Sequence, residues 1–457
     1  MKKEKPYMKQ KLSFQEYVYV AVMLFGMFFG AGNLIFPVYM GQVAGRNVWP
    51  AILGFLVTGV GLPLLGVAAL GISRSTGLFD LSRKVGRPYA YFFTCALYLT
   101  IGPCFAIPRC ATTSFTVGLE QILPSGGQSR VYLLLFSLLF FAAALFFSLR
   151  PGKILTYVGK VLTPCFLLFL AILVLVTLLN PTTSIGAVEP QGAYAAQPFM
   201  TGFLEGYNTM DALASLAFGI VVVQVIRDLG VEKPEAIALN TVRSGVFSCL
   251  LMGVIYLLVT IMGVQSRGAL EASANGGDAL AQIAQYYLGK AGLLVLAATV
   301  TLACLKTAVG LITSCAETFA GVFPGSLSYR GWVLVFTGAS FLLANVGLTA
   351  IITYAVPVLM FLYPLAITLI LLALFGRFFG HDRAVYCWVT GLTLPAALFD
   401  LLRTLPEGIL SALHADGLVA ALGRLLPLSS LGLGWVCPAV LGLVIGLIFH
   451  AVRPRRS

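Results

Sequence analysis

About twelve stretches of roughly 20 mostly apolar residues follow one another along this 457-residue chain, and each is long enough to span the hydrocarbon core of a bilayer as a helix. Hydrophobic residues make up 59% of the chain and charged residues only 10%. Soluble domains average about 45–50% apolar and about 25% charged residues. The sequence therefore predicts an all-α integral membrane protein of about 12 transmembrane helices. It excludes a soluble enzyme, a DNA-binding module and a secreted disulfide scaffold. The predicted helices are centred near Phe29, Leu62, Leu99, Phe141, Leu168, Leu213, Ile255, Leu305, Val335, Val358, Val389 and Leu443.

Lysine and arginine residues are unevenly distributed between the predicted loops. With the N-terminus placed inside, 21 of the 29 lie in inside segments and six in outside segments. The other two, Arg109 and Lys306, fall within membrane segments. Because cytoplasmic loops collect Lys and Arg, this asymmetry predicts that both termini are cytoplasmic. It also explains the net charge of +12 without a nucleic-acid partner.

Several classes of membrane protein lack support in the sequence. The nine cysteines lie in apolar stretches without a CxxC or Cys/His cluster, which indicates packing residues rather than metal ligands. No HExxH, GxSxG or GxxxxGK[ST] motif is present, so neither an enzyme nor an ATP-driven pump is expected. Repeated charge rings or carbonyl filters, which are typical of channels, are also missing from the sequence. A carrier without an organic cofactor remains.

The first apolar stretch contains a predicted helix break. Gly30-Ala31-Gly32-Asn33 is followed by Pro37, and glycine costs roughly 1 kcal/mol and proline roughly 3 kcal/mol in a helix interior. Glycines also allow helices to pack closely, but Asn33 and Pro37 favour a break. In a bilayer, freed backbone groups must find partners or line a wet cavity. The break therefore predicts a binding site in which N–H groups hold a carboxylate and carbonyls with Asn33 hold a cation.

A second interrupted stretch, Gly202–Gly219, is rich in polar residues and lies five predicted helices after the first. Two interrupted helices at this spacing, entered from opposite sides, predict a 5+5 inverted repeat with two peripheral helices. We expect five parts: a cytoplasmic N-terminal segment (1–13), the first repeat (14–179), an external loop (180–200), the second repeat (201–376), and two peripheral helices with a cytoplasmic C-terminus (377–457).

At this point the motifs resemble a known family. Leu24–Pro37 resembles the opening helix of the bacterial branched-chain amino acid carriers (system II, BrnQ-type, LIVCS). Similar matches are Gly54–Pro63, Ile101-Gly102-Pro103 with Ile107-Pro108-Arg109, Gly202–Gly219, and Ala303 with Ala316-Glu317. The resemblance covers nearly the whole chain. It implies a leucine-transporter-like fold in the bacterial plasma membrane that imports leucine, isoleucine and valine, usually with sodium.

The resemblance also implies roles for individual residues. The α-amino and α-carboxylate groups of the substrate would bind at the first break, to Gly30, Ala31, Gly32 and Asn33. The opposite side of the substrate would be lined by Ala214, Ser215 and Phe218. Asn33, Thr209 and Thr307 would be sodium ligands.

Lys306 departs from the family pattern, because it stands where hydroxyl ligands of a second sodium are usual. Its ammonium is expected either to take the cation position itself or to carry a proton. Sodium and proton therefore both remain open as coupling ions, as does uncoupled exchange.

Four further ionisable residues lie within predicted membrane segments: Arg109, Glu205, Asp211 and Glu317. Such residues usually face a cavity or pair with one another. Asp211 is expected to take part in ion coupling because it lies near the second break. Arg109 is expected either to belong to an ion pathway or to pair with Glu205 or Glu317.

The apolar walls around an aliphatic side chain are expected to be formed by Phe218, Tyr98 and Leu99. The sequence thus predicts a branched-chain amino acid symporter, with a carrier for other neutral amino acids as the alternative; the oligomeric state stays open.

Overall fold

The computed structural model describes residues 12–73, 75–123, 129–412, 414, 417, 419, 422–423 and 426–452. The described residues form helices joined by loops, as predicted for an all-α protein. Residues 1–11 of the predicted N-terminal segment and the basic C-terminal residues 453–457 lie outside the described part of the chain.

The first half of the chain forms nine α-helices. Three spans are interrupted by π-helical turns, η2 (Val57–Gly61), η3 (Thr100–Cys104) and η6 (Leu155–Leu162), and α7 runs on into a fourth, η4 (Ser114–Leu119). The helices are α1 (Phe14–Phe28), α2 (Gly32–Ala44), α3 (Val48–Leu56), α4 (Leu62–Ile72), α5 (Leu78–Ser82), α6 (Arg87–Leu99), α7 (Ala106–Thr113), α8 (Ser129–Ser148) and α9 (Thr163–Leu179).

The second half forms the remaining helices. They are α10 (Ala193–Ala196), α11 (Pro198–Glu205), the 3₁₀ turn η8 (Gly206–Thr209), α12 (Asp211–Asp228), α13 (Pro234–Ser266), α14 (Gly276–Val322), α15 (Tyr329–Ala344), α16 (Leu348–Phe375), α17 (Arg383–Arg403), α18 (Glu407–Ala412) and α20 (Val436–Val452). α14 bends at Gly289, whose φ is 58°, so its first part forms a separate segment before the span.

The helices account for the predicted membrane segments. Within the described residues, nine helical segments are long and apolar enough to cross a membrane, and three shorter apolar helices are α1, α15 and α20. Eleven of the twelve predicted centres lie inside a helix, and Phe29 lies at the junction of α1 and α2. Large apolar side chains on the outer faces, such as Leu139 and Leu179, are exposed as a bilayer-facing surface requires.

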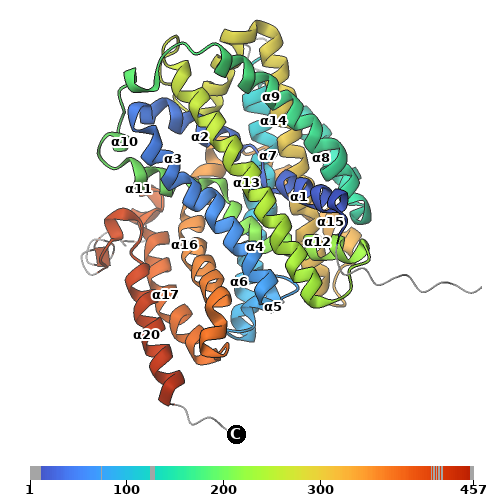
Figure 1. The fold of residues 1–457 in the computed structure, drawn as a ribbon, viewed down its shortest axis with the longest axis vertical. Coiled ribbons are helices and arrows are strands. Elements are labelled where there is room, and N and C mark those ends of the chain that lie inside the picture. Colours follow the sequence, from blue (N-terminus) through green and yellow to red (C-terminus); the bar gives the residue numbers. More distant parts are fainter. Residues whose placement is uncertain are drawn as a thin grey trace, which may run out of the picture.

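The broken helices lie at the centre of the bundle. α1 packs against α12, α13 and α14, and α14 also contacts α2, α7 and α9. α17 and α20 lie together at one side of the bundle in Figure 1, where α20 packs on α17 and α17 on α16. This arrangement matches the expectation of a central core with two peripheral helices.

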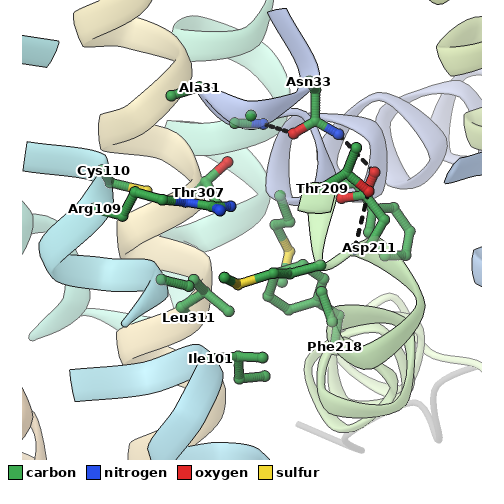
Figure 2. A pocket seen from close by; sticks show the side chains of 17 residues that line it. Ala31, Asn33, Ile101, Arg109, Cys110, Thr209, Asp211, Phe218, Thr307 and Leu311 are labelled. Carbon is green, nitrogen blue, oxygen red and sulfur yellow. Dashed lines mark hydrogen bonds between the residues drawn. The ribbon is translucent and has the colours of Figure 1, made fainter. Parts of the chain in front are cut away.

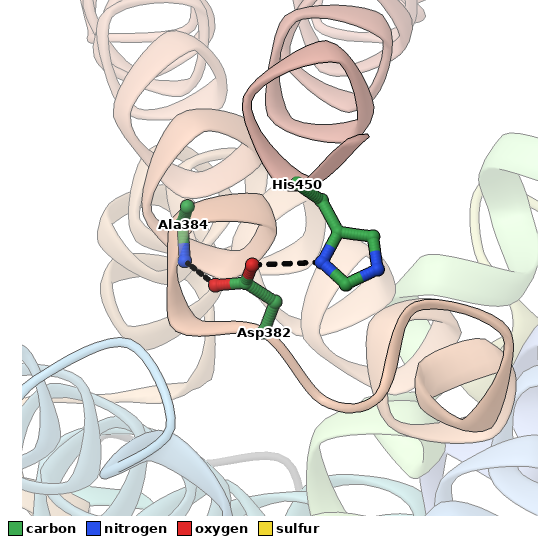
Figure 3. A network of polar contacts seen from close by, with 3 residues as sticks. All are labelled: Asp382, Ala384 and His450. Atoms are coloured by element: carbon green, nitrogen blue, oxygen red, sulfur yellow. Dashed lines mark hydrogen bonds and ion pairs between the residues drawn. The ribbon is translucent and has the colours of Figure 1, made fainter. Parts of the chain in front are cut away.

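A polar contact ties the last helix to its neighbour (Figure 3). Asp382 accepts a hydrogen bond from the Ala384 N–H at 2.8 Å and so caps the start of α17. Its other carboxylate oxygen lies 2.8 Å from Nδ1 of His450 near the end of α20. The contact fixes the end of α20 beside the start of α17.

Two glycines allow α2 and α13 to cross closely. A Cβ atom on Gly41 would lie 2.2 Å from the Thr260 carbonyl oxygen, and one on Gly263 would lie 2.2 Å from the Val38 carbonyl oxygen. Small residues that bring backbones together are a common means of packing membrane helices. The crossing fixes the position of α2, which is the second half of the first membrane span and directly follows the helix break at residues 29–31.

We expect Gly41→Ala to lower the apparent melting temperature of the purified protein, because the added methyl group meets rigid backbone and overpacking costs about 1–3 kcal/mol. Gly338→Ala on α15 is the matched control, since an added Cβ there meets no atom within 4 Å. It should leave the melting temperature unchanged or slightly higher. Equal melting curves for the two variants would contradict this account of the crossing.

Candidate functional site

The first break lies between α1 and α2, at residues 29–31. In a continuous helix the Gly30 N–H would bond to the Gly26 carbonyl, four residues earlier. It donates instead to Oδ1 of Asn33 at 2.8 Å. The break therefore frees the carbonyl of Gly26, and the side chain of Asn33 replaces the missing helical acceptor.

The second break lies between α11 and α12. It consists of the 3₁₀ turn η8 and Met210, whose φ of 65° is unusual for a residue with a side chain. The carbonyl of Tyr207 accepts from the Tyr363 hydroxyl at 2.8 Å, and the carbonyl of Asn208 accepts from Arg109 at 3.0 Å. Side chains from α16 and α7 thus hold the turn open.

Asp211 joins the two breaks. Its Oδ2 atom accepts from Nδ2 of Asn33 at 2.6 Å and from the Tyr256 hydroxyl at 2.7 Å. Asn33 and Tyr256 are also in hydrogen-bonding contact with each other. The carboxylate, the amide and the phenol come from α12, α2 and α13 and are buried. A buried network of this kind fixes the relative positions of the helices that carry it.

A small cavity lies between the breaks (Figure 2). The volume of this cavity is about 30 Å³. That is enough for about two water molecules and too little for an amino acid. Neighbouring side chains must therefore move before a substrate enters. The lining residues are Met27, Phe28, Gly30, Ala31, Gly32, Asn33, Ile101, Ala106, Arg109, Cys110, Thr209, Met210, Asp211, Ala214, Phe218, Thr307 and Leu311.

Lys306 lies beneath the first break. Its ammonium donates to the Gly26 carbonyl at 2.9 Å and also to the Phe29 carbonyl. The Phe166 ring centroid lies 4.3 Å from Nζ, and the rings of Phe25 and Phe29 lie at 5.6 and 5.7 Å, distances that allow cation–π attraction. Thr307 is placed beside the same carbonyl, with Oγ1 3.5 Å from the Gly26 oxygen.

Arg109, on α7, lines the same cavity as Thr307. The helix before it is broken at Gly102 and Pro103, and this turn places the guanidinium between the two breaks. The carbon of the guanidinium lies 6.0 Å from the centroid of the Phe36 ring. Phe36 also lines a larger outer hollow of about 500 Å³, so this pair lies between the hollow and the cavity.

The structure brings most of the predicted site residues together, but not all. Ser215 donates to the Ala212 carbonyl at 2.6 Å and packs against Gly66, away from the cavity. Glu205 lines the outer hollow. Glu317 lies further along α14, and its buried Oε2 has no hydrogen-bond partner among the described residues.

Two sets of expected contacts differ from the structure. Within the described chain Arg109 forms no ion pair with Glu205 or Glu317. Arg109 lines the cavity, whereas Glu205 lines the outer hollow and Glu317 lines neither. Of the expected apolar walls, only Phe218 lines the cavity. Leu99 is 38% exposed on the outer surface, and the Tyr98 hydroxyl bonds to the Ala217 carbonyl at 3.0 Å.

Other residues of the site were not found from the sequence. Tyr256 lies in an apolar stretch where nothing in the sequence separates it from its neighbours, and no sequence feature placed Ile101 or Leu311 in the cavity. Tyr256 shares its burial and its polar tip with several other tyrosines of the chain. Only the fold shows that its hydroxyl reaches Asp211.

Comparison with known proteins assigns the family. The family model for the branched-chain amino acid transport protein matches residues 13–453. The chain is 51% identical to the branched-chain amino acid permease BrnQ of Lactobacillus delbrueckii subsp. lactis, over 98% of this chain and 100% of the relative. It is 41% identical to the permease BraB of Bacillus subtilis, over 96% and 97%. This chain belongs to the branched-chain amino acid transport protein family.

Solved structures support the fold expected for this family member. MhsT in complex with L-phenylalanine has a TM-score of 0.55 at 15% identity, over 96% of this chain and 98% of that chain. Mhp1, a nucleobase-cation-symport-1 family transporter, has a TM-score of 0.56 at 14% identity, over 98% and 96%. The chain is a multi-pass membrane protein with the leucine-transporter-like fold.

We expect Asn33→Ala to reduce uptake of radiolabelled leucine to background in cells that lack other leucine carriers. The substitution leaves the Gly30 N–H without its acceptor, at a cost of about 1–3 kcal/mol, and removes one of the two hydrogen bonds to Oδ2 of the buried Asp211. Immunoblotting of membranes should show that the variant is still inserted.

Asn345→Ala is the matched control. Asn345 bonds to the Phe341 carbonyl of its own helix and to Ser137, far in sequence from both breaks. Its uptake should equal that of the parent protein. Normal leucine uptake by the Asn33→Ala variant would contradict the assignment of the first break to the binding site.

Proposed function

We propose that this protein imports leucine, isoleucine and valine across the bacterial plasma membrane by alternating access, with a proton rather than sodium at the first break. The family and the names of its relatives support the substrate class. The hydrogen bonds from Lys306 to the Gly26 and Phe29 carbonyls are the observation that favours a proton over sodium as the coupling ion. Both termini are proposed to be cytoplasmic because of the Lys and Arg asymmetry of the loops.

The residues that line the cavity suit a neutral aliphatic amino acid once neighbouring side chains have moved to admit it. Phe218, Ile101 and Leu311 offer apolar contact, and the two breaks offer polar backbone groups. An apolar pocket distinguishes one methylene from another by only about 1–3 kcal/mol. Overlapping use of leucine, isoleucine and valine follows from this chemistry. A carrier for other neutral amino acids is the alternative, and competition with a panel of amino acids separates the two.

The donor set at the first break favours an ammonium over a sodium ion. The carbonyl oxygens of Gly26 and Phe29 already accept from Lys306, whose ammonium is a compact positive charge with three donors. Two of the three proposed sodium ligands also accept hydrogen bonds within the protein. Oδ1 of Asn33 accepts from the Gly30 N–H at 2.8 Å, and the Thr209 hydroxyl oxygen accepts from the Asp211 N–H at 3.4 Å.

Loss of the proton from Lys306 would weaken the tie between α1 and α14. A neutral amine has one donor fewer and no cation–π attraction to Phe25, Phe29 and Phe166. The first half of the broken helix would then be free to move relative to α14. Protonation and release of Lys306 would in this way bias the bundle between its two access states.

The test is leucine uptake into proteoliposomes with proton and sodium gradients imposed separately. We expect an inward proton gradient to drive accumulation without sodium. In Lys306→Thr the proton gradient should no longer drive accumulation, while exchange of internal for external leucine continues. Lys153→Thr, which changes an exposed lysine, should behave as the parent protein does.

Two results would contradict the proposal. Accumulation that needs sodium and ignores the proton gradient would refute proton coupling. Identical ion dependence in Lys306→Thr and the parent protein would remove Lys306 from the coupling mechanism.

A further inference from the structure

Two buried charges of opposite sign line the cavity without touching each other. Asp211 is 1% exposed and Arg109 is 8% exposed. They enter the cavity from different sides in Figure 2, Asp211 from α12 and Arg109 from α7. No ion pair joins them within the part of the chain that the structure describes. Burying a charge without a partner is costly, so such a pair indicates that a third group completes it.

Arg109 has donors to spare. A guanidinium carries five N–H groups, and in the described chain only one of its hydrogen bonds is formed, from Nη1 to the Asn208 carbonyl. Nη2 faces the start of α2: it would lie 3.2 Å from a Cβ atom on Gly32. Gly32 carries no side chain, and this leaves the space in front of the guanidinium open.

The start of α2 adds to the same positive region. α2 is 13 residues long and begins at Gly32, with no side chain capping its first N–H groups. Helix N-termini favour negative charge through their N–H groups and the helix dipole. The nearly buried guanidinium and the helix start therefore converge on one place, which suits a carboxylate.

Asp211 offers the complementary group. Both of its side-chain hydrogen bonds fall on Oδ2, from Asn33 and Tyr256. Asp211 itself lines the cavity, and Oδ1 is its second oxygen. A carboxylate oxygen held in this position suits an ammonium group.

We propose that Arg109 and Asp211 form a two-ended receptor for a zwitterion, in which Arg109 with the start of α2 binds the α-carboxylate and Asp211 binds the α-ammonium. This inference rests on the proposed function and deepens it. The receptor accepts α-amino acids with both groups free, and the side chain then lies against Phe218, Ile101 and Leu311. Binding joins the two charges through the substrate and draws α7, α2 and α12 together.

The experiment compares three ligands on the purified full-length protein by competition with radiolabelled leucine. Leucine carries both charged groups, leucinamide lacks the carboxylate, and 4-methyl-2-oxopentanoate lacks the ammonium. On the parent protein, leucinamide and the oxo acid should each bind at least about tenfold more weakly than leucine. Leucinamide that binds as tightly as leucine would contradict the role of Arg109 without the use of any variant.

Two variants assign the ends of the receptor. Arg109→Gln should weaken leucine at least about tenfold and leave leucinamide nearly unchanged, so that the preference between them disappears. Asp211→Asn should weaken leucine and leave the oxo acid nearly unchanged. Arg46→Gln, at an exposed ion pair with Glu189, is the control and should keep the parent affinities.

Different results point to different failures. If Arg109→Gln weakens leucine and leucinamide equally, Arg109 is a structural residue and the inference is wrong. If the Arg109→Gln variant is too unstable to purify, Arg109→Lys is tested instead, because it keeps a positive charge. Arg109→Lys should weaken the binding of leucine but not that of leucinamide. Equal weakening of the binding of both ligands would again contradict the inference. If the parent protein binds no leucine at all, the proposed function itself fails.

Discussion

The organisation of this protein depends on a requirement of backbone chemistry: peptide groups freed inside a bilayer need partners. At the first break, Asn33 takes the Gly30 N–H and Lys306 takes the Gly26 and Phe29 carbonyls. At the second, Arg109 and Tyr363 take the Asn208 and Tyr207 carbonyls. The partners come from other helices, so each break is also a joint between helices. Whatever binds at the breaks acts on those joints.

Two positive charges perform different tasks in this arrangement. Lys306 is enclosed by two carbonyls and three aromatic rings, an environment that a cation fills completely. Arg109 uses one donor for the second break and keeps the others directed to the cavity. Asp211 is the buried acidic residue of the same site, fixed by Asn33 and Tyr256. The difference separates a group suited to coupling from a group suited to substrate recognition.

The sequence predicted the parts of the structure that leave a local chemical signal. Glycine, asparagine and proline around residue 30 predicted the first break, and the run of apolar stretches predicted the helices. Tyr256 and Leu311 left no such signal, because their roles come from helix crossings far apart in the sequence. The expected pairing of Arg109 with Glu205 or Glu317 failed for a related reason. Charge complementarity gives candidates for ion pairs, but the fold decides which of them meet. Glu205 lines the outer hollow, whereas Arg109 lines the cavity.

The most direct measurement is an experimentally determined structure of the protein in a lipid nanodisc with leucine and sodium, at a resolution that shows side chains and ions. The account predicts leucine between the two helix breaks, with the Lys306 ammonium on the Gly26 and Phe29 carbonyls. It would be contradicted by a continuous helix through residues 29–33, or by a sodium ion on those carbonyls with Lys306 turned away.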